Sequence, residues 1–64
     1  MRITEFRRRM AEEFGQARAE MLAKDHVLSG LGGRTVEQAL AGGVPAKEIW
    51  QQVCAEFHIP PERR

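Results

Sequence analysis

Cys54 and His58 are the residues whose types and spacing most resemble part of a metal site. They lie four residues apart, which places two side chains on one face of a helix, and thiolate and imidazole both bind zinc. A zinc site takes three or four protein ligands, and His26 is the one other histidine. Cys54 also belongs to an apolar stripe, where a free cysteine behaves as a small hydrophobic residue. We therefore expect no metal site and no cofactor.

Asp25, His26 and Ser29 could be drawn as a catalytic acid, base and nucleophile. Adjacent residues on a helix point about 100° apart, so Asp25 could not orient the His26 imidazole toward Ser29. Asp25 is better explained as the N-cap of a short helical turn. A substrate pocket is also difficult to enclose in so short a chain. We expect no enzymatic activity.

The run Arg7, Arg8 and Arg9 concentrates positive charge, and Arg34 is a further candidate for contact with phosphate. Three glutamates stand at i,i+4 positions relative to the run, which predicts ion pairs along a solvated helix face. They are Glu5, Glu12 and Glu13. Ten basic and nine acidic residues give a net charge of +1, whereas proteins that bind nucleic acid through phosphates usually have a clear basic excess. The charge disfavours nucleic-acid binding by Arg7, Arg8, Arg9 and Arg34, which stays an alternative.

The stretch from Thr35 to Val53 predicts two helices joined by a tight glycine turn. Ala39, Gly43 and Ile49 fall where a helix-turn-helix motif favours a small residue, a glycine and an aliphatic residue, although any tight helix pair needs similar residues. The exposed face of the second helix would carry mainly acidic and amide side chains. These are Glu48, Gln51, Gln52 and Glu56. Because phosphates repel carboxylates, we interpret the pair as packed helices that resemble a helix-turn-helix.

The first half of the chain predicts helices separated at glycine. Thr4 is expected to cap a first helix with apolar residues at steps of three or four. These residues are Ile3, Phe6, Met10, Phe14 and Ala17. Gly15 predicts a bend, and residues 16–24 form a second helical stretch. Its inward-facing residues are expected to be Ala17, Met21 and Leu22.

Capping signals divide the middle of the chain. Asp25 is expected to begin a short helical turn that ends at Gly32–Gly33. Thr35 and Gln38 have the spacing of a capping box, in which each side chain bonds the other residue's backbone N–H. The segment "GGRT" also resembles an anion cradle at a helix N-terminus, but the capping box would occupy two of its donors. The helix that follows is expected to stop at Gly42–Gly43.

The last helix is the most strongly amphipathic. Pro45 suits its first turn, because the N–H that proline lacks would be unpaired there. The apolar stripe comprises Ile49, Trp50, Val53, Cys54 and Phe57. Pro60–Pro61 is expected to end the helix. Since strand signals are absent, the sequence predicts an all-α fold: one domain, residues 1–64, built as a compact bundle of four to five short helices.

Several segments together resemble a known family: "MRITEF", "DHVL", "GGRTVEQAL", "GVPAKEIW" and "VCAEFHIPPE". They are similar to a family of small actinobacterial proteins of unknown function, often encoded near the RecA recombinase and its modulator RecX. Arg7 departs from the pattern, because tryptophan is frequent there. The resemblance implies a bacterial cytoplasmic protein and a link to DNA repair, and it supplies no catalytic residue.

Composition narrows the location and the function. A single cysteine suits a reducing compartment, and no apolar run approaches the roughly 20 residues needed to cross a membrane. The N-terminus lacks a secretory signal, so we expect a cytoplasmic protein. We expect a monomer or homodimer that acts as a non-enzymatic protein-interaction module. Its candidate contact patch is Leu31, Arg34, Val44 and Trp50, since tryptophan and arginine are enriched at binding hot spots. Burial of Trp50 in the core, with the rest of its apolar stripe, is the favoured alternative.

Overall fold

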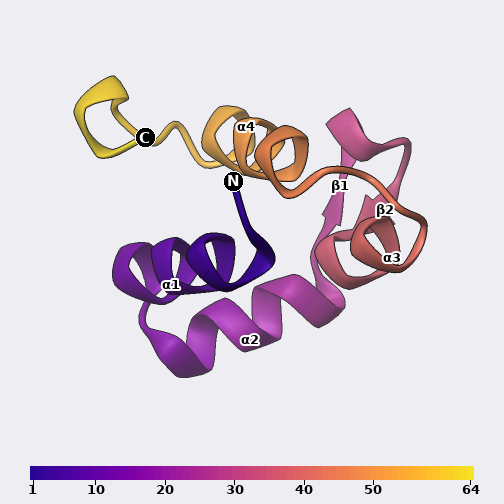
Figure 1. The fold of residues 1–64 in the computed structure, drawn as a ribbon, viewed down its shortest axis with the longest axis horizontal. Coiled ribbons are helices and arrows are strands. Elements are labelled where there is room, and N and C mark those ends of the chain that lie inside the picture. The colour runs from indigo at the N-terminus through magenta and orange to yellow at the C-terminus, as the bar shows by residue number, and fades with distance from the viewer.

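Four helices and a two-stranded antiparallel sheet make up the computed structural model, which describes residues 1–64. The elements are α1 (Ile3–Phe14), α2 (Gln16–Asp25), β1 (Val27–Leu28), β2 (Arg34–Thr35), α3 (Val36–Ala41) and α4 (Ala46–Glu56). Short 3-10 turns span Ser29–Leu31 and Pro61–Arg63. Helices α1 and α2 lie side by side, α4 packs across α1, and the hairpin and α3 stand at the far end of α2 (Figure 1). No helix has both the length and the apolar character needed to span a membrane.

The first two helices are separated at Gly15, as predicted. Gly15 is both the C-cap of α1 and the N-cap of α2, with φ of 85° and ψ of 148°, a backbone region that is essentially restricted to glycine. The predicted cap at Thr4 is wrong. Helix α1 begins at Ile3 with Arg2 as its N-cap, and no side chain caps it.

The buried face of α2 differs from the predicted one. Ala19 and Ala23 are buried, whereas Met21 is 61% exposed, Ala17 is exposed and Leu22 is half-buried. The prediction carried the period of α1 across Gly15, but the glycine interrupts the helix and resets its phase. The small alanine side chains on the inner face allow α2 to pack closely against α1 and α3.

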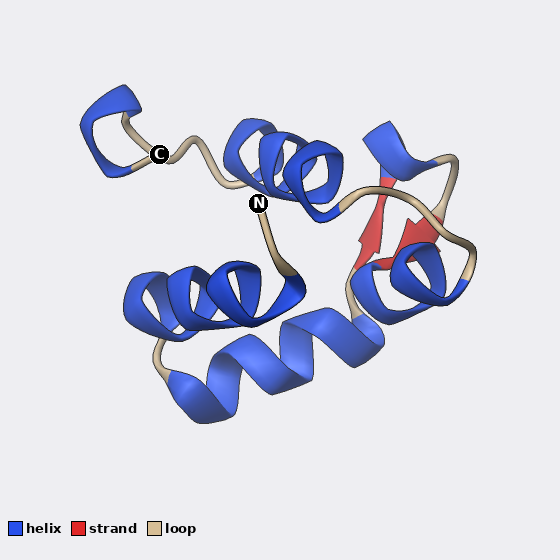
Figure 2. Cartoon of the chain, viewed as in Figure 1, coloured by secondary structure: helices blue, strands red, loops and turns tan.

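A small hairpin corrects the all-α prediction (Figure 2). Val27 pairs with Thr35, and Leu28 pairs with Arg34. Asp25, predicted as a cap, is instead the last residue of α2. Two residues per strand are too few to produce the alternating pattern by which a strand is recognised in a sequence. Only the last part of the predicted helical turn is helical: Ser29–Leu31 forms a 3-10 turn between the strands, and its C-cap is Gly32 in the left-handed region, with φ of 70°.

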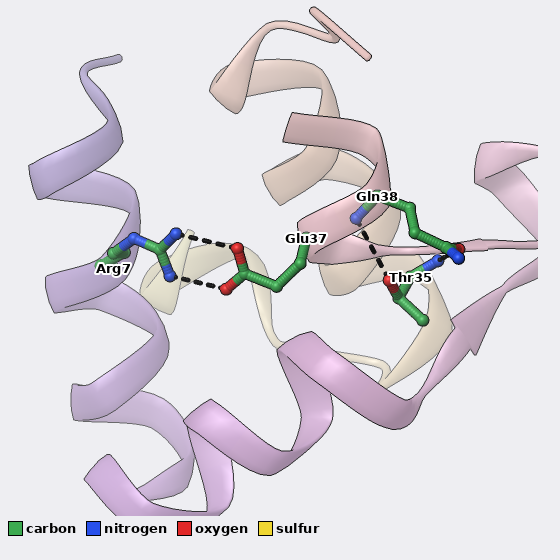
Figure 3. A network of polar contacts seen from close by, with 4 residues as sticks. All are labelled: Arg7, Thr35, Glu37 and Gln38. Atoms are coloured by element: carbon green, nitrogen blue, oxygen red, sulfur yellow. Dashed lines mark hydrogen bonds and ion pairs between the residues drawn. The ribbon is translucent and has the colours of Figure 1, made fainter. Parts of the chain in front are cut away.

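Helix α3 has the predicted capping box at its start. The Gln38 backbone N–H donates to Thr35 Oγ1 at 3.2 Å, and the Thr35 N–H donates to Gln38 Oε1 at 3.0 Å (Figure 3). The helix ends at Ala41, just before the predicted glycines. Pro45 precedes the first turn of α4 as its N-cap.

Helix α4 supplies the centre of the core. Its buried residues are Ala46, Ile49, Trp50, Val53 and Cys54, which confirms the predicted stripe up to Phe57, a half-buried residue. The helix ends at Glu56, earlier than the predicted stop at the prolines. His58 then adopts a left-handed φ of 55°, which turns the chain so that Ile59 is buried in the same core.

Candidate functional site

Three of the four predicted contact residues meet at one corner of the molecule. A hollow of about 270 Å³ opens between the 3-10 turn, β2, the α3–α4 loop and the first turns of α4. We call it the glycine corner, and its residues are Gly30, Leu31, Gly32, Arg34, Val44, Glu48 and Gln52. The corner thus contains the predicted residues Leu31, Arg34 and Val44, together with two polar residues of α4 that the sequence did not single out for it.

The side chains of the corner are arranged around an apolar floor. Leu31 is only 6% exposed, Val44 is half-buried beside the core, and Arg34 is exposed. The Arg34 Nε donates to the Leu31 carbonyl oxygen at 3.0 Å, so the guanidinium is held in place while its two Nη groups make no hydrogen bond within the chain. This geometry presents free donors next to apolar surface.

Gly30 and Gln52 define the side of the corner nearest α4. A Cβ atom at Gly30 would stand 1.9 Å from Gln52 Oε1, so the amide of Gln52 lies directly against the glycine backbone. A larger residue at position 30 would displace this side chain. No local sequence signal links the two residues, because their contact depends on how the 3-10 turn packs against α4.

Trp50 does not belong to the corner, because it is buried in the core, which is the alternative that its place on the apolar stripe favoured. Its side chain is 4% exposed and packs edge-on against Phe6, with ring centroids 6.2 Å apart and an interplanar angle of 80°. Its Nε1 donates to the Arg64 carbonyl oxygen at 3.4 Å. Trp50 lies on the stripe that faces α1, so the bulk that suggested a binding hot spot instead fills the core.

Arg7 is the arginine of the run that bonds a distant helix. Its Nη1 and Nη2 donate to the two carboxylate oxygens of Glu37 in α3, at 2.9 and 3.1 Å (Figure 3). This bidentate hydrogen bond raises the pKa of Arg7 and lowers the pKa of Glu37. Sequence reasoning missed Glu37, since nothing local to either residue shows that α1 and α3 come together.

The other two arginines of the run differ in their partners. Arg9 Nη2 lies 3.7 Å from Glu5 Oε1, and this is the one predicted i,i+4 ion pair that forms. Arg9 also donates to the Arg64 carbonyl oxygen. Arg8 is exposed and has no ion pair, and the predicted pairs with Glu12 and Glu13 are absent. Glu13 pairs with Arg63 instead, at 2.8 Å. Two of the three charges are therefore already matched within the chain.

One family model matches nearly the whole chain. The model of the family described as "Protein of unknown function (DUF3046)" matches residues 1–62. The chain belongs to the DUF3046 family. No curated protein and no solved structure matches it significantly.

The titratable residues that suggested chemistry are dispersed in this DUF3046 chain. Cys54 is buried, and burial raises the pKa of its thiol. His26 Nε2 lies 3.5 Å from Glu56 Oε2. The imidazole packs on the Phe57 ring, with ring centroids 4.9 Å apart. No three His, Cys, Asp or Glu side chains form a group that could hold a metal ion.

Proposed function

We propose that this DUF3046 protein is a non-enzymatic, cytoplasmic module that binds a protein partner through the glycine corner. The observation that carries the proposal is the Arg34 guanidinium beside an apolar floor. Its Nε is fixed by the Leu31 carbonyl, so a partner carboxylate or carbonyl can use the Nη groups without first ordering the side chain. Arginine next to apolar surface is a frequent composition of binding hot spots.

The rim of the corner suits a protein better than a polyanion. Glu48 and Gln52 line it together with Arg34, so donors, acceptors and charges of both signs surround the floor. Such a mixture resembles the polar rim of a protein–protein interface around an apolar centre. The corner is also built on firm supports, because β2 leads directly into the capping box of α3 and Leu31 is part of the core.

The alternative is a DNA-associated protein in which α3 and α4 act as a helix-turn-helix, with a role in DNA repair or recombination. Arg8 and the Nη groups of Arg34 favour it, since they are free to contact phosphate. Arg7 and Arg9 support it less, because both have partners within the chain. The exposed face of α4 also carries Glu48 and Glu56, which phosphates repel. We therefore rank it second.

Capture from a lysate of the source organism tests the proposal. The bait is the full chain, compared with Val44→Asp and Arg34→Glu at the corner, and Arg8→Glu serves as a control with the same charge change on a free surface arginine. We expect a protein that is retained by the wild type and by Arg8→Glu and lost with both corner variants. Circular dichroism of each bait verifies that the fold is kept.

Two results would contradict the proposal. The first is a bound protein whose retention is the same on the wild type and on both corner variants, because the corner would then make no contact. The second is retention of nucleic acid that is lost with Arg8→Glu and Arg34→Glu alike, which would favour the alternative.

A further inference from the structure

We propose that residues 60–64 form a releasable strap that covers Cys54 and the Trp50 indole and opens while the helices stay folded. This C-terminal strap follows Ile59, the last residue of the chain that is buried in the core. The backbone N–H of Ile59 donates to the Cys54 carbonyl oxygen at 3.0 Å. The left-handed turn at His58 and the bond of Ile59 to α4 give the strap a fixed starting point.

The strap itself contributes nothing to the core. It contains a single 3-10 turn, Pro61–Arg63, in which no residue is buried. Figure 1 shows this turn lying beyond the end of α4, apart from the packed helices. Because no residue of this turn is buried, the strap adds little apolar surface of its own to the core.

Polar contacts with α1 and α4 hold it instead. The Arg63 guanidinium pairs with Glu13 of α1, from Nη2 at 2.8 Å and from Nε at 2.9 Å. The Arg64 carbonyl oxygen accepts from Arg9 and, at 3.4 Å, from Trp50 Nε1. Ion pairs at a surface contribute weakly and are screened by salt. A segment attached in this way belongs to the part of a fold that opens locally.

An unpaired donor on a side chain that bonds the strap also weakens the closed arrangement. Arg9 donates to the strap, yet its Nε is buried with no hydrogen-bond partner. A buried donor without a partner costs free energy in the closed arrangement. The closed strap therefore combines weak attachment with a local penalty.

Cys54 and Trp50 are the residues that opening would expose. Both line a hollow of about 540 Å³ that Arg64 borders, although their side chains are only 1% and 4% exposed. Burial is the main cause that raises the pKa of the Cys54 thiol, and Arg64, Glu13 and Arg9 also act on it. Three charged groups that take part in the contacts of the strap, Arg64, Glu13 and Arg9, therefore also act on the thiol.

The rate of Cys54 alkylation by N-ethylmaleimide, an uncharged reagent, measures how often the strap opens in the full chain. Cys54 is the sole cysteine, so the signal has one source. Glu13→Gln removes the α1 side of the ion pair and Arg63→Gln removes the strap side. Glu12→Gln is the matched control, because Glu12 is exposed on the same helix and has no ion pair.

We expect Glu13→Gln and Arg63→Gln each to accelerate alkylation about two- to fivefold at low salt, the effect of one exposed ion pair. The double variant should be no faster than the faster single variant, since both changes break the same contact. Raising the NaCl concentration from about 20 to about 500 mM should accelerate the wild type toward the variants. Removing a negative charge favours the thiolate and removing a positive charge disfavours it, so acceleration in both variants reports access to the thiol.

A series at low urea separates strap opening from global unfolding. Local opening exposes far less surface than global unfolding, so the alkylation rate should rise with urea much less steeply than global unfolding does, well below the unfolding midpoint. A rate that rises from zero urea with the full slope of global unfolding would overturn the proposal. Equal rates for Glu13→Gln and Glu12→Gln would overturn it as well.

Discussion

The Arg7–Glu37 ion pair links α1 to α3 at the surface. Its contribution to the free energy of unfolding can be measured by substituting Glu37 alone. The side chains of Arg7 and Glu37 are 51% and 37% exposed, so solvent screens the pair. Glu37→Gln should therefore reduce the free energy of unfolding at neutral pH by only about 0.5–1 kcal/mol. Urea denaturation followed by circular dichroism measures the change. Glu20→Gln, which removes an exposed glutamate without an ion pair, should change it less.

The pH dependence of this difference follows from the direction of the pKa shift. The hydrogen bond from Arg7 holds the pKa of Glu37 below its ordinary value of 4.5. The stabilisation is therefore fully present above pH 4.5 and is lost as the pH falls through the lower folded value. Wild type and Glu37→Gln should converge in stability at about pH 2, when the carboxyl is protonated. A stability difference that persists undiminished there would contradict the account.

At the scale of elements, the capping box decides whether α3 forms. Six residues are too few for a helix to be stable by itself, so its reciprocal bonds at Thr35 and Gln38 matter more than they would in a longer helix. Thr35→Ala should reduce the free energy of unfolding by about 1 kcal/mol, and Thr35→Ser, which keeps the hydroxyl, should recover most of it. Urea denaturation measures both changes.

Thr4 provides the matched control for that prediction. It was expected to cap the first helix but lies inside α1, is exposed and caps nothing. Thr4→Ala should change the stability by less than about 0.5 kcal/mol. An equal loss for Thr4→Ala and Thr35→Ala would mean that the capping bonds do not explain the stability of α3.

The same two threonines show what the sequence can predict about elements. The capping box at Thr35 could be predicted because its two partners stand three residues apart. The bend at Gly15 could be predicted because a glycine is enough to interrupt a helix. The hairpin was missed because Val27 and Leu28 are too few for a strand pattern, and their pairing with β2 is set by the turn between the strands. The reciprocal capping pair and the glycine break were predicted correctly, whereas the lone caps at Thr4 and Asp25 and the pairing between segments were not.

At the scale of the whole molecule, the candidate site could be predicted only in part. Leu31, Arg34 and Val44 were placed in one patch with Trp50 because tryptophan and arginine are enriched at hot spots, and these three residues do meet. The position of Trp50 depends on which helix packs against α4, and α1 buries it through Phe6. The contacts of Glu37 and Gln52 could not be predicted from the sequence. They depend on how α1 lies beside α3 and on how the 3-10 turn packs against α4.

The nearly neutral charge of the whole molecule favours a protein partner over a nucleic acid. A net charge of +1, with Arg7, Arg9 and Arg63 each paired to a glutamate, leaves little excess of positive charge to displace counterions from a nucleic acid. Docking through Leu31 and Val44 would instead depend on apolar contact. The two mechanisms differ in how salt affects the affinity.

A salt titration of binding is the most direct test of the central claim. The dissociation constant of the wild-type protein for its captured partner is measured between about 50 and about 200 mM salt, and for a generic DNA duplex under the same conditions. The account predicts that the affinity for the protein partner changes little over this range and that the duplex is bound weakly or not at all. Tight duplex binding that collapses across the same range would contradict it.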